Sequence, residues 1–345
     1  MVNILLRYTN LIIITLFILS LLSFSLAYLF PGNPIEVLTG LKLEELQKLQ
    51  NQSANIAYKP EGSVLSQYGH YMSELFSGNW GVSFNSGQPL YEEIMLSLPA
   101  SIELSAYALT LSLLVGLPLG FLAALRHHRA TDYTLLSISV VGYSIPVFWL
   151  ALILILVFSL QFGWLPLSGR LSLIFEVPSN TGFVLLDILL ADIEDKPSVF
   201  LDAFRHLILP TLSIAIVTTT LILRITRRSV IETLNSEFIQ AAYARGLTTR
   251  QVLMRHGIRN ALVPILPLLA MQFPTLLTNA MIVETIFSWP GIGNWLIQAI
   301  YQQDYSAIRA GMLAVSVFVV IFTMSIDMFL RLTDPKRKKI ERGTI

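Results

Sequence analysis

Long apolar stretches recur along the chain, each separated from the next by a polar segment. Each reaches the roughly 20 mostly apolar residues that a helix needs to cross a bilayer. They are too long and too continuous for the strands of a membrane barrel, which need about 10 alternating residues. The pattern predicts an all-α polytopic membrane protein with six transmembrane helices. The stretches cover Thr9–Phe30, Ile102–Leu125, Thr134–Phe162, His206–Ile225, Ala261–Phe287 and Ala307–Leu330.

The first stretch also has features of a secretory signal peptide. Arg7 supplies a positive charge ahead of it, and Ser25-Leu26-Ala27 resembles a cleavage site of small residues. Its apolar core is longer than the roughly 7–15 residues usual in signal peptides. We therefore expect residues 1–30 to stay in the protein as its N-terminal transmembrane helix.

Composition agrees with a membrane protein and excludes several other classes. Hydrophobic residues make up 54% of the 345 residues and charged residues 13%, against about 25% charge in ordinary soluble domains. The net charge of +1 gives no field that would attract nucleic acid. The chain has no cysteine, and its five histidines are scattered. We therefore expect no catalytic site, no cofactor and no metal site.

Lysine and arginine are distributed unevenly between the two sets of connecting segments. If the N-terminus is cytoplasmic, 16 of the 23 basic residues lie inside and 7 lie outside. Cytoplasmic loops of membrane proteins carry such an excess. The bias predicts that both termini are cytoplasmic (N-in/C-in), with the basic tail Lys336–Lys339 near anionic lipid.

The long connection between the fourth and fifth stretches carries the signals of a helical hairpin. Ser236 suits the N-cap of a short helix, and Glu237 would follow at the positive end of the helix dipole. Gly246 suits the left-handed position that ends a helix. One face of this helix would carry the residues at positions 238, 241, 242 and 245.

A second set of signals begins directly after Gly246. Thr248 and Gln251 have the spacing of a capping box, and Leu247 and Val252 that of a hydrophobic staple. These local signals alone are also compatible with an ordinary connecting hairpin. A role in the protein's activity needs support from elsewhere in the chain.

The same segment resembles the EAA loop of permease subunits from ATP-binding-cassette importers. That loop reads Glu-Ala-Ala, three residues, Gly, nine residues and Ile-x-Leu-Pro. Here Gln240-Ala241-Ala242 is followed after three residues by Gly246. Gln240 replaces the Glu, and His256–Ala261 stands in place of Ile-x-Leu-Pro. Both departures are similar to the dipeptide and oligopeptide branch of the family.

Other motifs extend the resemblance over nearly the whole chain. Within the branch, the chain is most similar to Sap-type permeases, which are linked to the handling of antimicrobial peptides and, in some bacteria, to putrescine import. The matching motifs lie at Leu98–Leu104, Gly142–Trp149, Glu284–Gly293 and Asp334-Pro335.

The resemblance implies a type I importer permease fold in the bacterial inner membrane, with the chain forming half of a translocation pathway for peptides. It also implies several partners: a second homologous permease, two ATPase subunits, a periplasmic binding protein and the lipid bilayer. The chain has no Gly-x-x-x-x-Gly-Lys-Ser/Thr phosphate loop, so ATP hydrolysis would reside in the partners. The residues implied in coupling to the ATPase are Phe238, Gln240, Ala241, Ala242, Arg245, Gly246 and Leu247.

The translocation pathway itself is less defined by the sequence. Prolines within the apolar stretches are either gating hinges or static kinks tolerated by packing. Ionisable residues in lipid usually face protein or water, and they serve either transport or helix packing. A secondary transporter or another channel that lacks ATPase partners is the alternative. The residues expected at the pathway or a gate are Gly142, Pro146, Glu284, Trp289 and Asp327.

The predicted organisation has three regions. Residues 1–30 form the N-terminal transmembrane helix, and residues 31–100 form a periplasmic loop region with a short surface helix over Leu41–Gln50. Residues 101–345 form a permease core of five transmembrane helices. Within this core, a cytoplasmic coupling loop is expected at about 227–260 and an acidic periplasmic segment at about 163–205.

Overall fold

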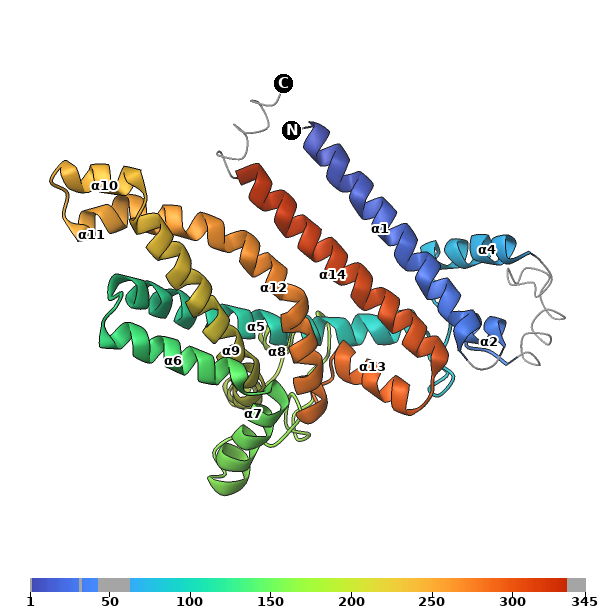
Figure 1. The fold of residues 1–345 in the computed structure, drawn as a ribbon. Coiled ribbons are helices and arrows are strands. Elements are labelled where there is room, and N and C mark those ends of the chain that lie inside the picture. The colour runs from blue at the N-terminus through green and yellow to red at the C-terminus, as the bar shows by residue number, and fades with distance from the viewer. Residues whose placement is uncertain (1, 31–32, 43–62, 334–345) are drawn as a thin grey trace. The chain divides into compact units, whose positions relative to one another are not determined.

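The computed structural model describes residues 2–30, 33–42 and 63–333 (Figure 1). In these ranges the regular elements are helices, apart from an isolated β-bridge between Val82 and Pro89, so the all-α prediction is confirmed. The helices are α1 (Val2–Leu29), α2 (Pro34–Thr39), α4 (Val64–Phe76), α5 (Leu90–Leu125), α6 (Ala130–Ser144), α7 (Val147–Leu154), η1 (Ile155–Gln161), α8 (Val184–Leu190), α9 (Lys196–Leu234), α10 (Glu237–Ala244), α11 (Thr249–Val252), η2 (Leu253–Gly257), α12 (Ile258–Ile286), α13 (Ile292–Tyr301) and α14 (Tyr305–Thr333). The elements η1 and η2 are π-helical.

Among the described residues, four helices are long and apolar enough to cross a membrane. Two bent pairs pass the same test together: Ala130–Ser144 with Val147–Gln161, and Asn260–Leu268 with Met271–Ile286. The number of spans rises to as many as six if each bent pair counts as one. The four helices are Leu6–Leu29, Leu90–Leu125, Lys196–Leu234 and Tyr305–Phe329.

The third predicted span, Thr134–Phe162, is not one continuous helix. The chain bends by 95° between α6 and the segment formed by α7 and η1. Proline lacks the N–H that would continue α6, and its ring pushes the preceding residue toward the extended region. Ile145 accordingly has φ −80° and ψ 122°, and Pro146 stands at the N-cap of α7. The predicted third span is therefore made of two helical segments that meet at a sharp bend.

Two compact units divide the chain. One contains residues 1–100 and 290–324, and the other contains residues 101–289 and 325–345. We call them the terminal unit and the core unit. Helices α5 and α14 each contribute to both units. These units do not show which segments face which side of a membrane, so the regions predicted from sequence stay a prediction.

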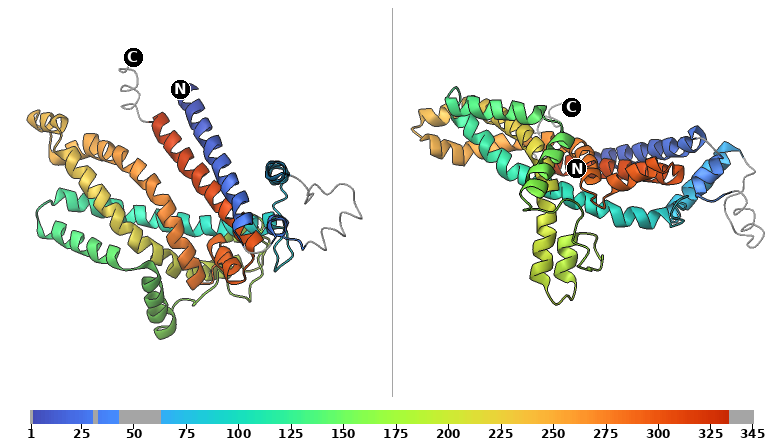
Figure 2. Two further views of the ribbon diagram at one scale, coloured as in Figure 1. Left: turned by 45° about the vertical axis from the view of Figure 1, so that its right-hand side comes forward. Right: turned by 90° about the horizontal axis from the view of Figure 1, so that it is seen from below.

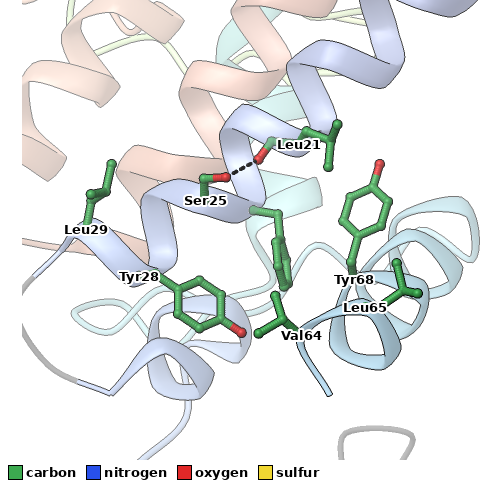
Figure 3. Close-up of a pocket in the computed structure, with 8 residues that line it drawn as sticks. Leu21, Ser25, Tyr28, Leu29, Val64, Leu65 and Tyr68 are labelled. Atoms are coloured by element: carbon green, nitrogen blue, oxygen red, sulfur yellow. Dashed lines mark hydrogen bonds between the residues drawn. The ribbon is translucent and has the colours of Figure 1, made fainter. Parts of the chain in front are cut away.

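In the terminal unit, the end of α1 packs against α2 and α4 through a cluster that includes Phe24, Val37 and Tyr71. A cavity of about 610 Å³ lies between α1 and α4. Figure 3 shows its mostly apolar wall, with the hydroxyl of Ser25 donating to the carbonyl of Leu21 (2.8 Å) within α1. The predicted surface helix over Leu41–Gln50 lies, from residue 43 onward, outside the described residues, as does the basic tail.

Two buried charged residues anchor the loops of the terminal unit to α14. Asp304 is 2% exposed, and its carboxylate accepts hydrogen bonds from the Ser83 hydroxyl (2.6 Å) and the Asn85 N–H (3.2 Å). Arg309 is 1% exposed and donates to the backbone carbonyls of Leu38 and Trp80, each at 3.1 Å. Buried charges need such partners. The chain around Leu38 and the chain from Trp80 to Asn85 are therefore held at α14 by polar contacts.

Helix α9 is the centre of the core unit, where it packs against α6, α7, α8 and α12. Small residues let the helices approach closely, as in many membrane proteins. A Cβ atom added at Gly142 of α6 would lie 2.6 Å from Cγ2 of Thr220. One added at Gly120 of α5 would lie 2.5 Å from Cβ of Thr226. Larger side chains at these two glycines would separate the helices.

Helix α9 begins earlier in the chain than the sequence predicts. Asp195 caps it by accepting a hydrogen bond from the N–H of Ser198 (3.3 Å), and Pro197 fits the first turn. The predicted fourth span, His206–Ile225, is therefore the middle of a 39-residue helix. The short helix α8 packs on this extension through buried apolar residues, as Ile188 shows.

Candidate functional site

The predicted coupling loop forms a compact helical hairpin between α9 and α12. Both views of Figure 2 place α10 and α11 at the far ends of those two long helices. Ile239, Ala242 and Val252 form the hairpin's own buried core, and Leu234 and Leu247 pack against it. The hairpin is therefore an internally packed body rather than a loose connection.

Gly246 ends α10 in the left-handed conformation, with φ +83°. Its N–H donates to the carbonyl of Tyr243 (2.9 Å), and the N–H of Leu247 donates to the carbonyl of Ala242 (3.4 Å). This pair of hydrogen bonds is the Schellman motif. No atom would lie within 4 Å of a Cβ added at Gly246. The backbone conformation, and not a lack of space, requires glycine here, as predicted.

The capping box that the sequence predicts for α11 is also confirmed. The side-chain oxygen of Gln251 accepts a hydrogen bond from the N–H of Thr248 (2.9 Å), and the N–H of Gln251 donates to the hydroxyl of Thr248 (3.4 Å). Leu247 packs against the cluster that contains Val252, as a hydrophobic staple requires. Local sequence therefore determines the turn between α10 and α11.

Ser236 was predicted to cap α10, but its side chain makes no capping hydrogen bond there. Its hydroxyl instead donates to the carbonyl of Thr233 (2.5 Å), in the last turn of α9. The last carbonyls of a helix lack partners within the helix, and nearby serine hydroxyls bond to them readily. Since α9 ends only at Leu234, its final turn competes for the Ser236 hydroxyl.

The predicted face of α10 is divided by burial. Ala242 belongs to the hairpin core, whereas Ala241 and Arg245 are exposed and Phe238 retains 45% exposure. Gln240 is also exposed, and its side chain donates to the carbonyl of Asn235 (3.4 Å). The outward surface therefore combines an aromatic ring, a methyl group and a guanidinium, while Ala242 and Leu247 shape the hairpin from within.

The residues predicted at the pathway or a gate occupy several places in the core unit. Gly142 packs against α9, and Pro146 lies at the 95° bend. Glu284 and Trp289 are fully buried, and the carbonyl of Glu284 accepts the N–H of Trp289 (2.8 Å). Asp327 is half-buried on α14. The structure brings Glu284 and Trp289 together and places the other three elsewhere.

Trp289 adjoins an ion pair that the sequence did not predict. The guanidinium of Arg170 lies 5.4 Å from the centre of the indole ring and binds the carboxylate of Glu103. Glu103 is 1% exposed and also accepts the N–H of Val184 (3.2 Å) and the hydroxyl of Tyr107 (3.3 Å). The sequence signal was an acidic residue near the edge of an apolar stretch, but its partner lies 67 positions away.

Comparisons with known proteins agree with the motifs. A family model described as "Binding-protein-dependent transport system inner membrane component" matches residues 116–339. The di/tripeptide transport system permease protein DppB of Pseudomonas aeruginosa is 38% identical, over 97% of this chain and 98% of the relative. The putrescine export system permease protein SapB of Escherichia coli K12 is 38% identical, over 97% of each chain. The dipeptide transport system permease protein DppB of the same strain is 34% identical, over 97% of this chain and 98% of the relative.

Proposed function

This chain belongs to the family of binding-protein-dependent transport system inner membrane components, and from that premise we propose that it forms half of the translocation pathway of a peptide importer. Members of the family are permease subunits of ATP-binding-cassette transporters in the bacterial inner membrane, and they are transport subunits rather than enzymes. Membership favours an ATP-driven system over a secondary transporter or an unrelated channel. It also implies ATPase and substrate-binding partners.

The proposed assembly pairs this chain with a second homologous permease, two ATPase subunits and a periplasmic binding protein. Nucleic acid has no place in it. The observation that carries the proposal is the hairpin: a self-capped, internally packed body that presents Phe238, Ala241 and Arg245 outward. Such a body can transmit a push from an ATPase surface without deforming. Gln240, Ala242, Gly246 and Leu247 keep its shape.

Peptides are the substrate class that we propose. Two of the similar relatives are named di/tripeptide or dipeptide permeases. The SapB relative is named as a putrescine export system permease, so putrescine would move outward in a system of that kind. A peptide importer would move its substrate inward, whereas a putrescine exporter would move its substrate outward. The measured direction of transport therefore distinguishes the two kinds of system.

The proposed function is tested with the complete complex reconstituted in proteoliposomes. We expect the permease to co-purify with ATPase subunits, and we expect labelled trialanine to accumulate only with ATP and the binding protein. Labelled putrescine serves as the second probe in both directions. Trialanine uptake that persists without ATPase subunits and collapses with a proton ionophore would support the secondary transporter instead.

We further propose six spans in the type I importer arrangement, with each bent pair crossing the membrane once and both termini cytoplasmic. The two bends allow this count, and the 16-to-7 distribution of basic residues favours the orientation. Glu176 would then lie in the periplasmic segment and Thr248 in the cytoplasmic hairpin. Both residues are exposed.

Single cysteines at these two positions test the orientation, because the chain has no cysteine of its own. In intact cells, a membrane-impermeant maleimide is expected to label Glu176→Cys and to leave Thr248→Cys unlabelled. After the cells are permeabilised, both should react equally. Labelling of Thr248→Cys in intact cells would reverse the proposed orientation, and labelling of neither residue after permeabilisation would contradict their exposure.

A further inference from the structure

An aspartate and an arginine from distant parts of the core unit form a buried, two-pronged ion pair. Nε of Arg227 lies 2.6 Å from Oδ1 of Asp132, and its Nη2 lies 2.8 Å from Oδ2. The carboxylate is 1% exposed and the arginine side chain 19%. Paired hydrogen bonds of this kind fix direction as well as distance. They therefore fix the start of α6 against α9.

The turn between α5 and α6 contributes to the same cluster. Nδ1 of His127 lies 2.9 Å from Oδ2 of Asp132 and 3.0 Å from Nη2 of Arg227. The N–H of His128 donates to Oδ2 of Asp132 (3.1 Å). His128 has φ +61°, and its ring stacks on that of His127. The turn thus closes around the carboxylate. We call Asp132, Arg227 and His127 the clasp.

The clasp lies close to the coupling hairpin along the chain and in space. Arg227 lies about two turns before the end of α9 at Leu234, and the hairpin follows directly after that end. The α5–α6 turn and the hairpin lie at the same end of the core unit (Figure 1). Two residues after Arg227, the hydroxyl of Ser229 donates to the carbonyl of Ala261 in α12 (2.7 Å). Both helices that carry the hairpin are therefore joined near it.

General stabilisation does not explain this arrangement well. Burying two charges removes them from water, and apolar residues of similar volume often stabilise a protein equally well. The neighbouring pair Arg228–Glu232 shows the ordinary alternative, with side chains 82% and 64% exposed and an Nε–Oε1 distance of 2.8 Å. What the buried pair adds is a fixed register between α9 and the α5–α6 turn.

We propose that the clasp transmits movement of the hairpin to the α5–α6 turn, so that Asp132 and Arg227 are positioning residues for the coupling of ATP hydrolysis to transport. The inference rests on the proposed function and adds a route to it. When an ATPase moves the hairpin, α9 moves with it, and the rigid pair carries the start of α6 along. Without the clasp, α9 would move while α6 stayed behind.

The test uses Asp132→Asn and Arg227→Lys in the full complex, with the binding protein, in proteoliposomes. Trialanine uptake and ATP hydrolysis are measured in the same preparation. Asparagine loses the charge, while lysine keeps its charge but loses the two-pronged geometry. Coupling between sites typically amounts to 5–150-fold, so we expect about tenfold less uptake. ATP hydrolysis should stay near the wild-type rate, so that the ATP consumed per peptide rises about tenfold.

Arg228→Gln is the matched control, because it removes an exposed ion pair from the adjacent position of the same helix. It should leave the ratio of ATP to peptide unchanged. If Asp132→Asn does not assemble, Asp132→Glu, which keeps the charge, takes its place. Its ratio of ATP hydrolysed to peptide transported then tests the inference in the same way. A wild-type ratio in the clasp variants overturns the inference, whether both activities are normal or both fall in parallel. Absence of ATP-driven uptake by the wild-type complex overturns the proposed function itself, and the inference with it.

Discussion

Gly246→Pro is expected to reduce ATP-driven uptake to less than about a tenth of the wild-type rate while leaving the permease in the membrane. Proline fixes φ near −65°, whereas residue 246 has φ +83°. Proline also lacks the N–H that bonds to the carbonyl of Tyr243. The turn between α10 and α11 must therefore change its course. The readouts are trialanine uptake by the complex and the amount of permease in the membrane fraction.

Two milder substitutions separate conformation from bulk at the same position. Asparagine tolerates the left-handed region, whereas alanine there is disfavoured by roughly 1–2 kcal/mol. Neither side chain meets an atom near its Cβ. Uptake should therefore fall in the order wild type, Gly246→Asn, Gly246→Ala, Gly246→Pro. Near-normal uptake by the proline variant would show that the hairpin geometry does not transmit force.

Arg170→Met is expected to destabilise the permease by about 3–5 kcal/mol, since it leaves the carboxylate of Glu103 buried without its cation. The indole of Trp289 would also lose the guanidinium above it. The measurement is the apparent unfolding temperature of the purified complex in detergent. Arg228→Gln again provides the exposed control and should shift that temperature little.

A double variant tests whether the loss comes from the unpaired charge. Glu103→Gln keeps an oxygen that can accept the N–H of Val184 but carries no charge. Combined with Arg170→Met, it should recover part of the stability that the single arginine variant loses. If the double variant loses more stability than the two single variants lose together, the unpaired charge is not the cause.

The parts of the site that sequence predicted best are those built by neighbours in the chain. Gly246 and the Thr248–Gln251 capping box act over three or four residues, so their geometry follows from local chemistry. Ser236 shows the limit of such arguments. Its hydroxyl can bond either to the last turn of α9 or to the first turn of α10. It bonds to the carbonyl of Thr233 in α9, because that helix extends to Leu234.

Contacts between distant segments were not predictable from one sequence. Asp132 and Arg227 are 95 positions apart, and Glu103 and Arg170 are 67 apart. Hydrophobic periodicity contains no information about which polar residues will pair. Trp289 illustrates the same point. It was predicted at the pathway or a gate, and that role stays a prediction because the structure shows a fully buried side chain beside Arg170 but, among the described residues, no pathway.

The bend at Pro146 has a consequence for the surrounding lipid. Helix α6 has 15 residues and, at about 1.5 Å per residue, reaches about 22 Å. The hydrocarbon layer of a typical bilayer is about 30 Å thick, and the apolar part of α1, with 24 residues, is long enough to cross it. A short hydrophobic element draws the two leaflets together beside it. In the proposed arrangement, α7 and η1 turn away from α6 by 95° and so add little to the reach of the crossing along the α6 axis. The lipid beside the exposed apolar residues Ile138 and Val141 of α6 would therefore be thinner than the lipid beside α1.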